Sequence, residues 1–248
     1  MPAAPSQIKV VRVSGLSNQE FLDRYAHPGR VGLSGGWTLV DKAIYRAERH
    51  LNEDEKWGSW SHAFLFQGQR LDGHHWVIES DLQIHHKHIQ LGVQENRISK
   101  YYDEKMYSSL AVLDLGLNET QIDGLLREGL ELVATRARYS LRELLGTVIA
   151  LRRPELRGKD NLLARERSMY CSAFVQHIFR KTGIDLAPGL ELKNTTPEDI
   201  ARTDVPHVKY LIERDPPTNK LKAFNARLRS GVEKRVRALK TRADRSVG

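Results

Sequence analysis

The single cysteine of the chain, Cys171, is a candidate nucleophile. It stands in the first turn of residues 169–182, where apolar side chains recur every three or four positions and predict a helix. Unpaired N–H groups and the helix dipole stabilise a thiolate at such a position. An inert buried thiol is the alternative, since free cysteine is among the residue types most often buried. A nucleophilic cysteine also needs a base and a group that orients this base.

His62 and Glu79 are the candidates for these two roles. His62 lies in the apolar residues 60–67 and Glu79 in residues 75–80; both segments are predicted to be strands, joined by the turn-like residues 68–73. If the strands form a hairpin, the two side chains can lie close together across it. A histidine in such a strand is more often a structural residue, and a buried glutamate requires a polar partner.

The elements that would position these residues form an α+β pattern. The segments with helical periodicity or capping residues begin at Ser17, Asn118 and Thr196, and the glycine-rich residues 32–36 are interpreted as turns. The predicted strands are residues 8–13, 60–67, 75–80, 89–91, 110–115 and 208–212. The predicted helices are a short one after Ser17 and residues 37–51, 118–138, 140–151, 169–182 and a helix that starts at 196.

The basic charge is concentrated at the carboxyl end, which predicts one domain over residues 1–218 and a tail over residues 219–248. The tail has ten Lys and Arg against two acidic residues, and this excess equals the net charge of +8 of the whole chain. Apolar residues recur every three or four positions in the tail, as in a basic amphipathic helix. Such a helix can lie on an anionic membrane or pack on the body or a second subunit; nucleic acid is the least favoured partner.

Composition excludes several classes of protein. The longest apolar run is far shorter than the about 18 residues that a membrane span needs, and no signal-peptide pattern is present. One cysteine permits neither an internal disulfide nor a zinc site with several cysteines. Residues 32–36 fit neither the phosphate-loop nor the dinucleotide pattern, so no cofactor is predicted. The expected location is the cytoplasm, with peripheral membrane contact or a dedicated export machine as open options.

The order of these motifs resembles that of the permuted papain-like cysteine hydrolases of the NlpC/P60 superfamily, and within it the YiiX-like group. The matching pieces are Gly36-Trp37, Ser61-His62-Ala63, Val77-Ile78-Glu79 and Tyr170-Cys171-Ser172, followed by Thr196-Pro197-Glu198-Asp199-Ile200. The likeness covers residues 30–205, and the histidine precedes the cysteine as a circular permutation requires. Related sequences often have Tyr followed by Asp where Tyr139 is followed by Ser140, so Tyr139 receives no role.

The resemblance implies a papain-like fold, in which an antiparallel sheet packs against helices that include the one starting at the cysteine. It also implies an amidase, peptidase or acyl-transfer activity through a thioester, with Cys171 as nucleophile, His62 as general base and Glu79 as orienting acid. The backbone N–H of Cys171 would be one oxyanion donor. Substrates considered are lipidated or otherwise acylated molecules, with a weak preference for a lipid-like one because of the tail, and cell-wall peptides.

Two other functions stay open. A non-catalytic papain-like scaffold would act through its tail at a membrane or a partner, and it is favoured if His62 points away from the sulfur of Cys171. A metal protein would use His86 and His88, which share a strand face, with Glu79 or Asp81 as a further ligand. Metal binding is the less favoured of the two because His74, His75 and residues 85–88 lie in a polar, turn-rich stretch.

Removal of residues 219–248 is expected to weaken binding to anionic vesicles and to leave the chemistry of the Cys171 thiol in place. The reason is that these residues contain the whole net charge of +8. Sedimentation of the full and shortened chains with vesicles that contain phosphatidylserine measures the effect. Equal binding by the two chains would contradict it.

Overall fold

A computed structural model describes residues 7–36, 59–85, 88–135 and 171–214. The predicted helices over 37–51 and 140–151, Tyr139 and the tail over 219–248 lie outside the described residues. The first compact unit of the chain is Met1–Glu213. The predicted domain boundary after residue 218 therefore stays a prediction.

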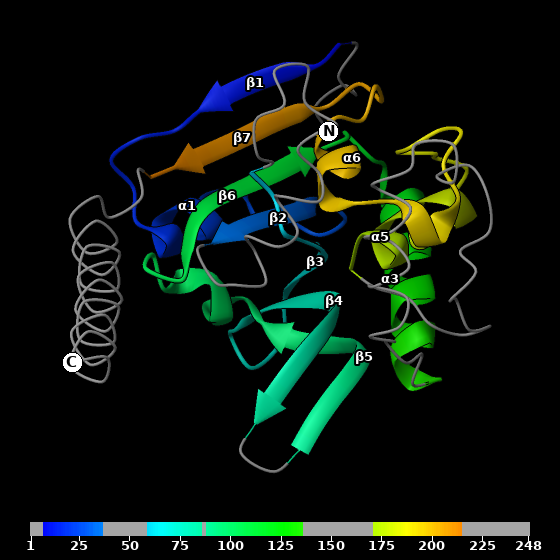
Figure 1. The fold of residues 1–248 in the computed structure, drawn as a ribbon, viewed down its shortest axis with the longest axis horizontal. Helices are drawn as coiled ribbons and strands as arrows, with labels where there is room; N and C mark the ends of the chain where they lie inside the picture. Colours follow the sequence, from blue (N-terminus) through cyan, green and yellow to red (C-terminus); the bar gives the residue numbers. More distant parts are fainter. Residues whose placement is uncertain (1–6, 37–58, 86–87, 136–170, 215–248) are drawn as a thin grey trace, which may run out of the picture. The chain divides into compact units, whose positions relative to one another are not determined.

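A seven-stranded sheet forms the centre of the described fold (Figure 1). Its strands follow the order β1-β7-β6-β2-β3-β4-β5, and all neighbours are antiparallel except β1 and β7, which run parallel. The α+β class is confirmed, whereas the expectation of a wholly antiparallel sheet is wrong for this one edge pair. The strands are β1 (Lys9–Arg12), β2 (Val31–Gly36), β3 (His62–Gln69), β4 (His75–His85), β5 (His88–Arg97), β6 (Tyr107–Asp114) and β7 (Val208–Glu213).

Three predicted helix starts are confirmed by their caps. Ser17, Asn118 and Thr196 each accept a hydrogen bond from the backbone N–H three residues later, and the side chain at that position accepts from the cap in return. These reciprocal bonds satisfy N–H groups that have no partner inside a helix. The described helices are α1 (Asn18–Tyr25), α3 (Glu119–Ala134), α5 (Cys171–Lys181) and α6 (Pro197–Ala201), with short 3-10 turns η2 (Ile98–Tyr102) and η4 (Leu192–Asn194).

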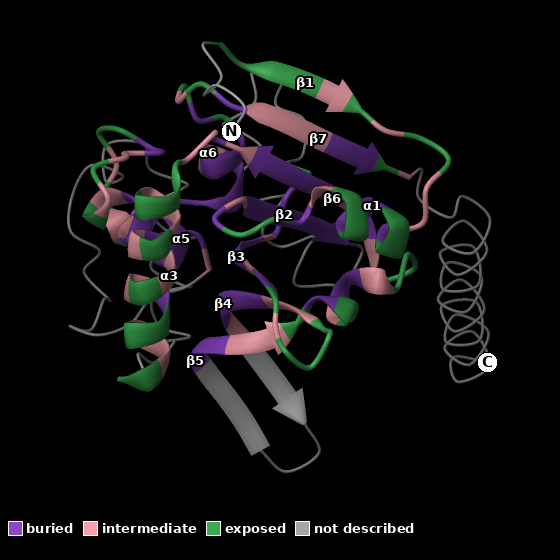
Figure 2. Ribbon diagram, turned by 180° about the vertical axis from the view of Figure 1, so that it is seen from behind, coloured by how far each residue is buried: buried purple, intermediate pink, exposed green. Residues whose placement is uncertain are grey.

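Successive strand residues point to opposite faces of the sheet, and each face has its own apolar cluster. Ala63, Leu65 and Ile78 pack with residues of α3, α5 and α6 on one face. Phe64, Phe66 and Val77 pack with α1 and η2 on the other face. The central strands are therefore buried on both sides, as the burial colours of Figure 2 show for β2 and β6.

The interpretation of residues 32–36 as turns is wrong, because they belong to the central strand β2. This strand pairs with β3 on one side and β6 on the other, and all six of its residues are buried. Glycine is required here by packing: a Cβ on Gly32 would lie 2.2 Å from the ring of Phe64. Glycine normally weakens a strand, and here the missing side chain makes room for an aromatic ring of the neighbouring strand.

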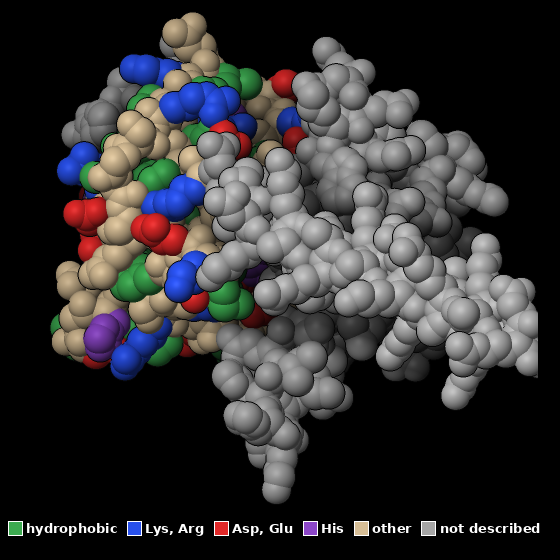
Figure 3. All heavy atoms as spheres, turned by 60° about the vertical axis from the view of Figure 1, so that its left-hand side comes forward, with side chains coloured by type: hydrophobic (Ala, Val, Ile, Leu, Met, Phe, Trp, Pro, Cys, Tyr) green, Lys and Arg blue, Asp and Glu red, His purple; other side chains and the backbone are tan. Residues whose placement is uncertain are grey.

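The described surface mixes charges of both signs. On the face drawn in Figure 3, Lys and Arg side chains are interspersed with Asp and Glu. Among the described residues, no helix has the length and apolar character that are needed to cross a bilayer.

Candidate active site

His62 and Glu79 lie on the same face of the sheet. His62 shares the β3 face of Phe64 and Phe66, and Glu79 shares the β4 face of Val77, the face that α1 and η2 cover. The predicted strand 75–80 is longer than expected and continues to His85, so Glu79 lies within β4 rather than at its end. Burial of this face excludes water from the carboxyl group, which is fully buried.

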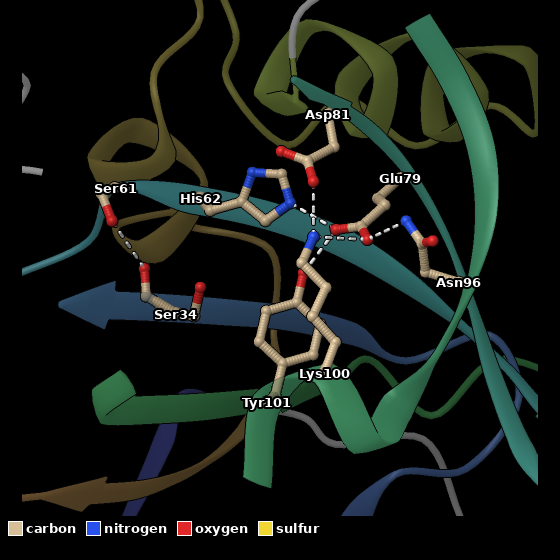
Figure 4. Close-up of polar contacts among 8 residues, drawn as sticks. All are labelled: Ser34, Ser61, His62, Glu79, Asp81, Asn96, Lys100 and Tyr101. Carbon is tan, nitrogen blue, oxygen red and sulfur yellow. Dashed lines mark hydrogen bonds and ion pairs between the residues drawn. The ribbon is translucent and has the colours of Figure 1, made fainter. Parts of the chain in front are cut away.

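A short hydrogen bond joins the two side chains. The Nε2 atom of His62 lies 2.6 Å from Oε2 of Glu79 (Figure 4). The second ring nitrogen of His62 points away from Glu79 in this view. The carboxylate therefore fixes both the ring orientation and the tautomer of His62, because Nε2 must be the protonated nitrogen.

Three further donors surround the carboxylate of Glu79. Asn96 Nδ2 and Lys100 Nζ donate to Oε1 at 2.6 and 2.8 Å, and the hydroxyl of Tyr101 donates to Oε2 beside His62. Sequence analysis predicted only that Glu79 needs a polar partner. It missed Lys100 and Tyr101, because no pairing or spacing rule relates the turn η2 to strand β4. It also missed Asn96, because the register in which β5 pairs with β4 was not predicted.

The charges in this cluster shift one another's protonation. Burial by itself raises the pKa of Glu79, but the hydrogen bond from His62 and the ammonium group of Lys100 outweigh it and hold this pKa well below its usual range. Burial by itself lowers the pKa of Lys100, but Glu79 and Asp81 raise it above its ordinary value. The Tyr101 pKa is raised by burial and by the nearby carboxylate, so this hydroxyl keeps its proton and donates.

Cys171 is the first residue of α5 and is partly exposed. The helix packs through Phe174 and Ile178 against the opposite face of the sheet, and its first turn meets the beginning of β3, where His62 is the first residue. The thiol is hydrogen-bonded to the His62 side chain and to the backbone of Ala63 and Ser172. Cys171 thus lies at the end of β3 where His62 begins the strand.

The thiol and the imidazole favour each other's charged forms. Burial by itself raises the pKa of Cys171, but the positive charge and hydrogen bond of His62 outweigh it and lower this pKa. For His62 burial lowers the pKa, yet the facing thiolate and the Glu79 carboxylate raise it to about 10. Such an arrangement can hold a thiolate–imidazolium pair, which is a nucleophile with a proton donor beside it.

The structure brings together the three residues that were singled out from sequence, Cys171, His62 and Glu79. Whether they act as nucleophile, base and orienting group stays a prediction at this point. Ser61, which precedes His62, has its own partner, because its hydroxyl lies 3.3 Å from the carbonyl oxygen of Ser34 (Figure 4).

The suggested metal ligands are only partly described. Both carboxylate oxygens of Glu79 accept hydrogen bonds, and Oδ2 of Asp81 lies 2.6 Å from Lys100 Nζ. His86 lies outside the described residues, and the side chain of His88 is not described. Within the described ranges, His, Cys, Asp and Glu side chains form no group of three that could hold a metal ion.

Comparisons with known proteins add a resemblance in structure alone. No protein-family model matches the chain. No curated protein matches it either. The fold is similar to that in the crystal structure of the metalloprotein yiiX from Escherichia coli O157:H7, with a TM-score of 0.48 and 12% sequence identity over 78% of this chain and 99% of that one.

Proposed function

We propose that this protein is a cysteine hydrolase or acyltransferase that cleaves an amide or ester bond through a thioester on Cys171. The observation that supports this most is the continuous chain from the buried Glu79 through His62 to the thiol. A carboxylate that orients an imidazole, which in turn faces a nucleophile, is the arrangement by which weak nucleophiles are activated. Cys171 itself is a partly exposed residue at the start of α5.

In the proposed first step, the Cys171 thiolate attacks the carbonyl carbon of the substrate. A C–S bond forms, and the electron pair of the C=O bond moves to the oxygen, which the backbone N–H of Cys171 would stabilise. When the intermediate collapses, the bond to the leaving nitrogen or oxygen breaks and His62 gives its proton to that atom. The products of this step are a thioester on Cys171 and a free amine or alcohol.

In the second step, water or another acceptor attacks the thioester. His62 takes a proton from the acceptor as the new bond to carbon forms, and the C–S bond breaks to regenerate the thiolate. Glu79 stays ionised throughout and stabilises the protonated form of His62. Its low pKa, held down by His62 and Lys100, suits this role.

The order of the residues supports a permuted papain-like fold as part of this proposal. His62 and Glu79 come from strands β3 and β4, and Cys171 follows them at the start of α5. In ordinary papain-like enzymes the cysteine helix precedes the histidine strand. The proposed substrates stay those of the sequence analysis, acylated or lipid-like molecules or cell-wall peptides.

Convergence of the three side chains favours catalysis over the scaffold alternative. A scaffold would not need a cysteine whose pKa is lowered by a facing imidazole, as that of Cys171 is. A scaffold would also not need the ionised, fully buried Glu79, because burial of a charged carboxylate costs free energy. The scaffold function therefore remains the alternative that is left if the alkylation experiment shows an ordinary thiol.

Alkylation by iodoacetamide between about pH 5 and pH 9 tests the activated thiol, because the chain has one cysteine. The thiolate forms above the lowered pKa of Cys171 and keeps its imidazolium partner until His62 loses its proton near pH 10. The rate is therefore expected to stay high well below the about 8.5 of an ordinary thiol. In the His62→Ala variant the midpoint is expected to move upward, and the rate at pH 6 to fall at least about tenfold.

Labelling after denaturation, which should be equal in the two proteins, controls for the amount of thiol. Unfolding measurements check that His62→Ala remains folded. A wild-type midpoint near that of an ordinary thiol, or equal rates in the two folded proteins, would reject the proposed nucleophile and leave the scaffold function.

A further inference from the structure

Lys100 differs from the other three donors to Glu79 because it carries a positive charge that does not depend on a proton from Cys171. Asn96 and Tyr101 donate as neutral groups, and the positive charge of His62 depends on the proton it receives from Cys171. The ammonium group of Lys100 lies 2.8 Å from Oε1 of Glu79 and is largely buried, with 24% of its side chain exposed. The Lys100 ammonium group therefore forms a largely buried ion pair with the carboxylate of Glu79.

Lys100 also separates two carboxylates. Its Nζ atom lies 2.6 Å from Oδ2 of Asp81, on the same strand as Glu79 (Figure 4). Without this cation, two nearby carboxylates would repel each other, and the fully buried one would take up a proton. A protonated Glu79 would no longer offset the charge of an imidazolium.

The backbone gives Lys100 a fixed position. Lys100 and Tyr101 are neighbours in the turn η2, and Tyr101 is fully buried with its ring stacked on Phe64 at 4.3 Å between centroids. The Lys100 Nζ lies 5.2 Å from the centre of the Tyr101 ring. The aromatic packing of Tyr101 therefore anchors the turn that places the ammonium group below Glu79.

We propose that Lys100 is a positioning residue of the active site, whose ammonium group keeps the buried Glu79 ionised and thereby maintains the imidazolium of His62 beside the Cys171 thiolate. This inference rests on the proposed function and extends it by one residue. Lys100 acts through Glu79 and then His62, and it does not touch the sulfur in the described contacts. The groups that face this cluster are His62 on β3, Asp81 on β4, Asn96 on β5, Tyr101 on η2 and Cys171 on α5.

The test compares the pH dependence of Cys171 alkylation by iodoacetamide in the full chain and its Lys100→Met variant. Loss of the cation is expected to let the buried Glu79 take up a proton, so that the imidazolium of His62 loses the opposite charge beside it. The thiolate then loses its imidazolium partner, and the midpoint is expected to rise by about one pH unit, the lower end of the effect of a neighbouring opposite charge. At pH 6 the rate falls about tenfold. Lys100→Arg, which restores the charge, is expected to recover most of the shift, and Lys105→Met, at an exposed lysine beyond the turn, is expected to behave as the wild type.

Lys100→Gln keeps a hydrogen-bond donor without the charge, and it serves as the second neutral variant if Lys100→Met unfolds. It is expected to shift the midpoint in the same direction. A purely structural role would instead lower the unfolding midpoint of both variants and leave the pH midpoint of the folded fraction in place, which would overturn the proposal.

The Glu79→Gln background decides whether Lys100 acts through the carboxylate. In that background Lys100→Met is expected to add no further shift, because there is no charge left to maintain. An equal shift in both backgrounds would show a direct effect on the thiol and overturn the positioning role. The two proposals fail separately: a wild-type midpoint near 8.5 refutes the activated cysteine, and a low wild-type midpoint that Lys100→Met leaves unchanged refutes only the role of Lys100.

Discussion

Replacement of Cys171 by alanine is expected to reduce acyl transfer by about 10⁴-fold or more, because the proposed covalent intermediate is a thioester on its sulfur. The fold should persist, since Cys171 is partly exposed and alanine is close to cysteine in size. The measurement is single-turnover release of p-nitrophenol from p-nitrophenyl esters of increasing acyl length. These probes do not require the natural substrate to be known.

Ser61→Ala is the matched control for this experiment. Ser61 immediately precedes His62, and its hydroxyl lies 3.3 Å from the Ser34 carbonyl oxygen. This variant is expected to retain the ester cleavage of the wild type to within a few-fold. Turnover that persists in Cys171→Ala and disappears in Ser61→Ala would assign the nucleophile to the hydroxyl instead of the thiol.

Replacement of Glu79 by alanine is expected to lower the free energy of unfolding by about 3–5 kcal/mol. The substitution removes a fully buried carboxylate and takes from Lys100, Asn96 and Tyr101 the acceptor that Glu79 provides, although Lys100 keeps its bond to Asp81. Urea denaturation followed by circular dichroism measures the loss. Glu79→Gln, which keeps an acceptor of similar shape, is expected to lose less stability and still to lose the alkylation at low pH.

Glu95→Ala is the comparison for a carboxylate on the neighbouring strand. Glu95 pairs with Arg70, but 25% of its side chain and 35% of that of Arg70 are exposed, so solvent screens the pair. The expected cost is below about 1 kcal/mol. Equal destabilisation by Glu79→Ala and Glu95→Ala would mean that the Glu79 network contributes no more than an ordinary surface ion pair.

The sequence patterns correctly predicted those parts of the fold that depend on interactions between residues close in sequence. The caps at Ser17, Asn118 and Thr196 depend on residues three positions apart, so the sequence displays both partners of each bond. The strand around residue 62 was expected from its apolar run, although its observed bounds are His62–Gln69. The predictions were wrong where the conformation depends on residues far apart in sequence. Gly32 was interpreted as part of a turn, but it lies in a central strand where the ring of Phe64 fills the space of a side chain.

The candidate site shows the same division. The type of Cys171, its place at a helix start, and the presence of a histidine and a glutamate on consecutive strands were visible without coordinates. The ion pair of Glu79 with Lys100 was not visible, because the two residues are 21 positions apart and belong to elements that no periodicity connects. The expected burial of a carboxylate predicts that it has a polar partner, but it does not identify that partner.

The sequence by itself determined the α+β class, the three helix caps and the identity of the candidate nucleophile, because each depends on residue type and near neighbours. Only the tertiary structure showed that η2 covers the face of β4 on which Glu79 lies. Only the tertiary structure showed that Cys171, at the start of α5, contacts His62 at the start of β3. The physical reason is burial. Only the packed sheet removes water from Glu79, and an ion pair gains its strength, and its influence on His62 and Cys171, from that removal.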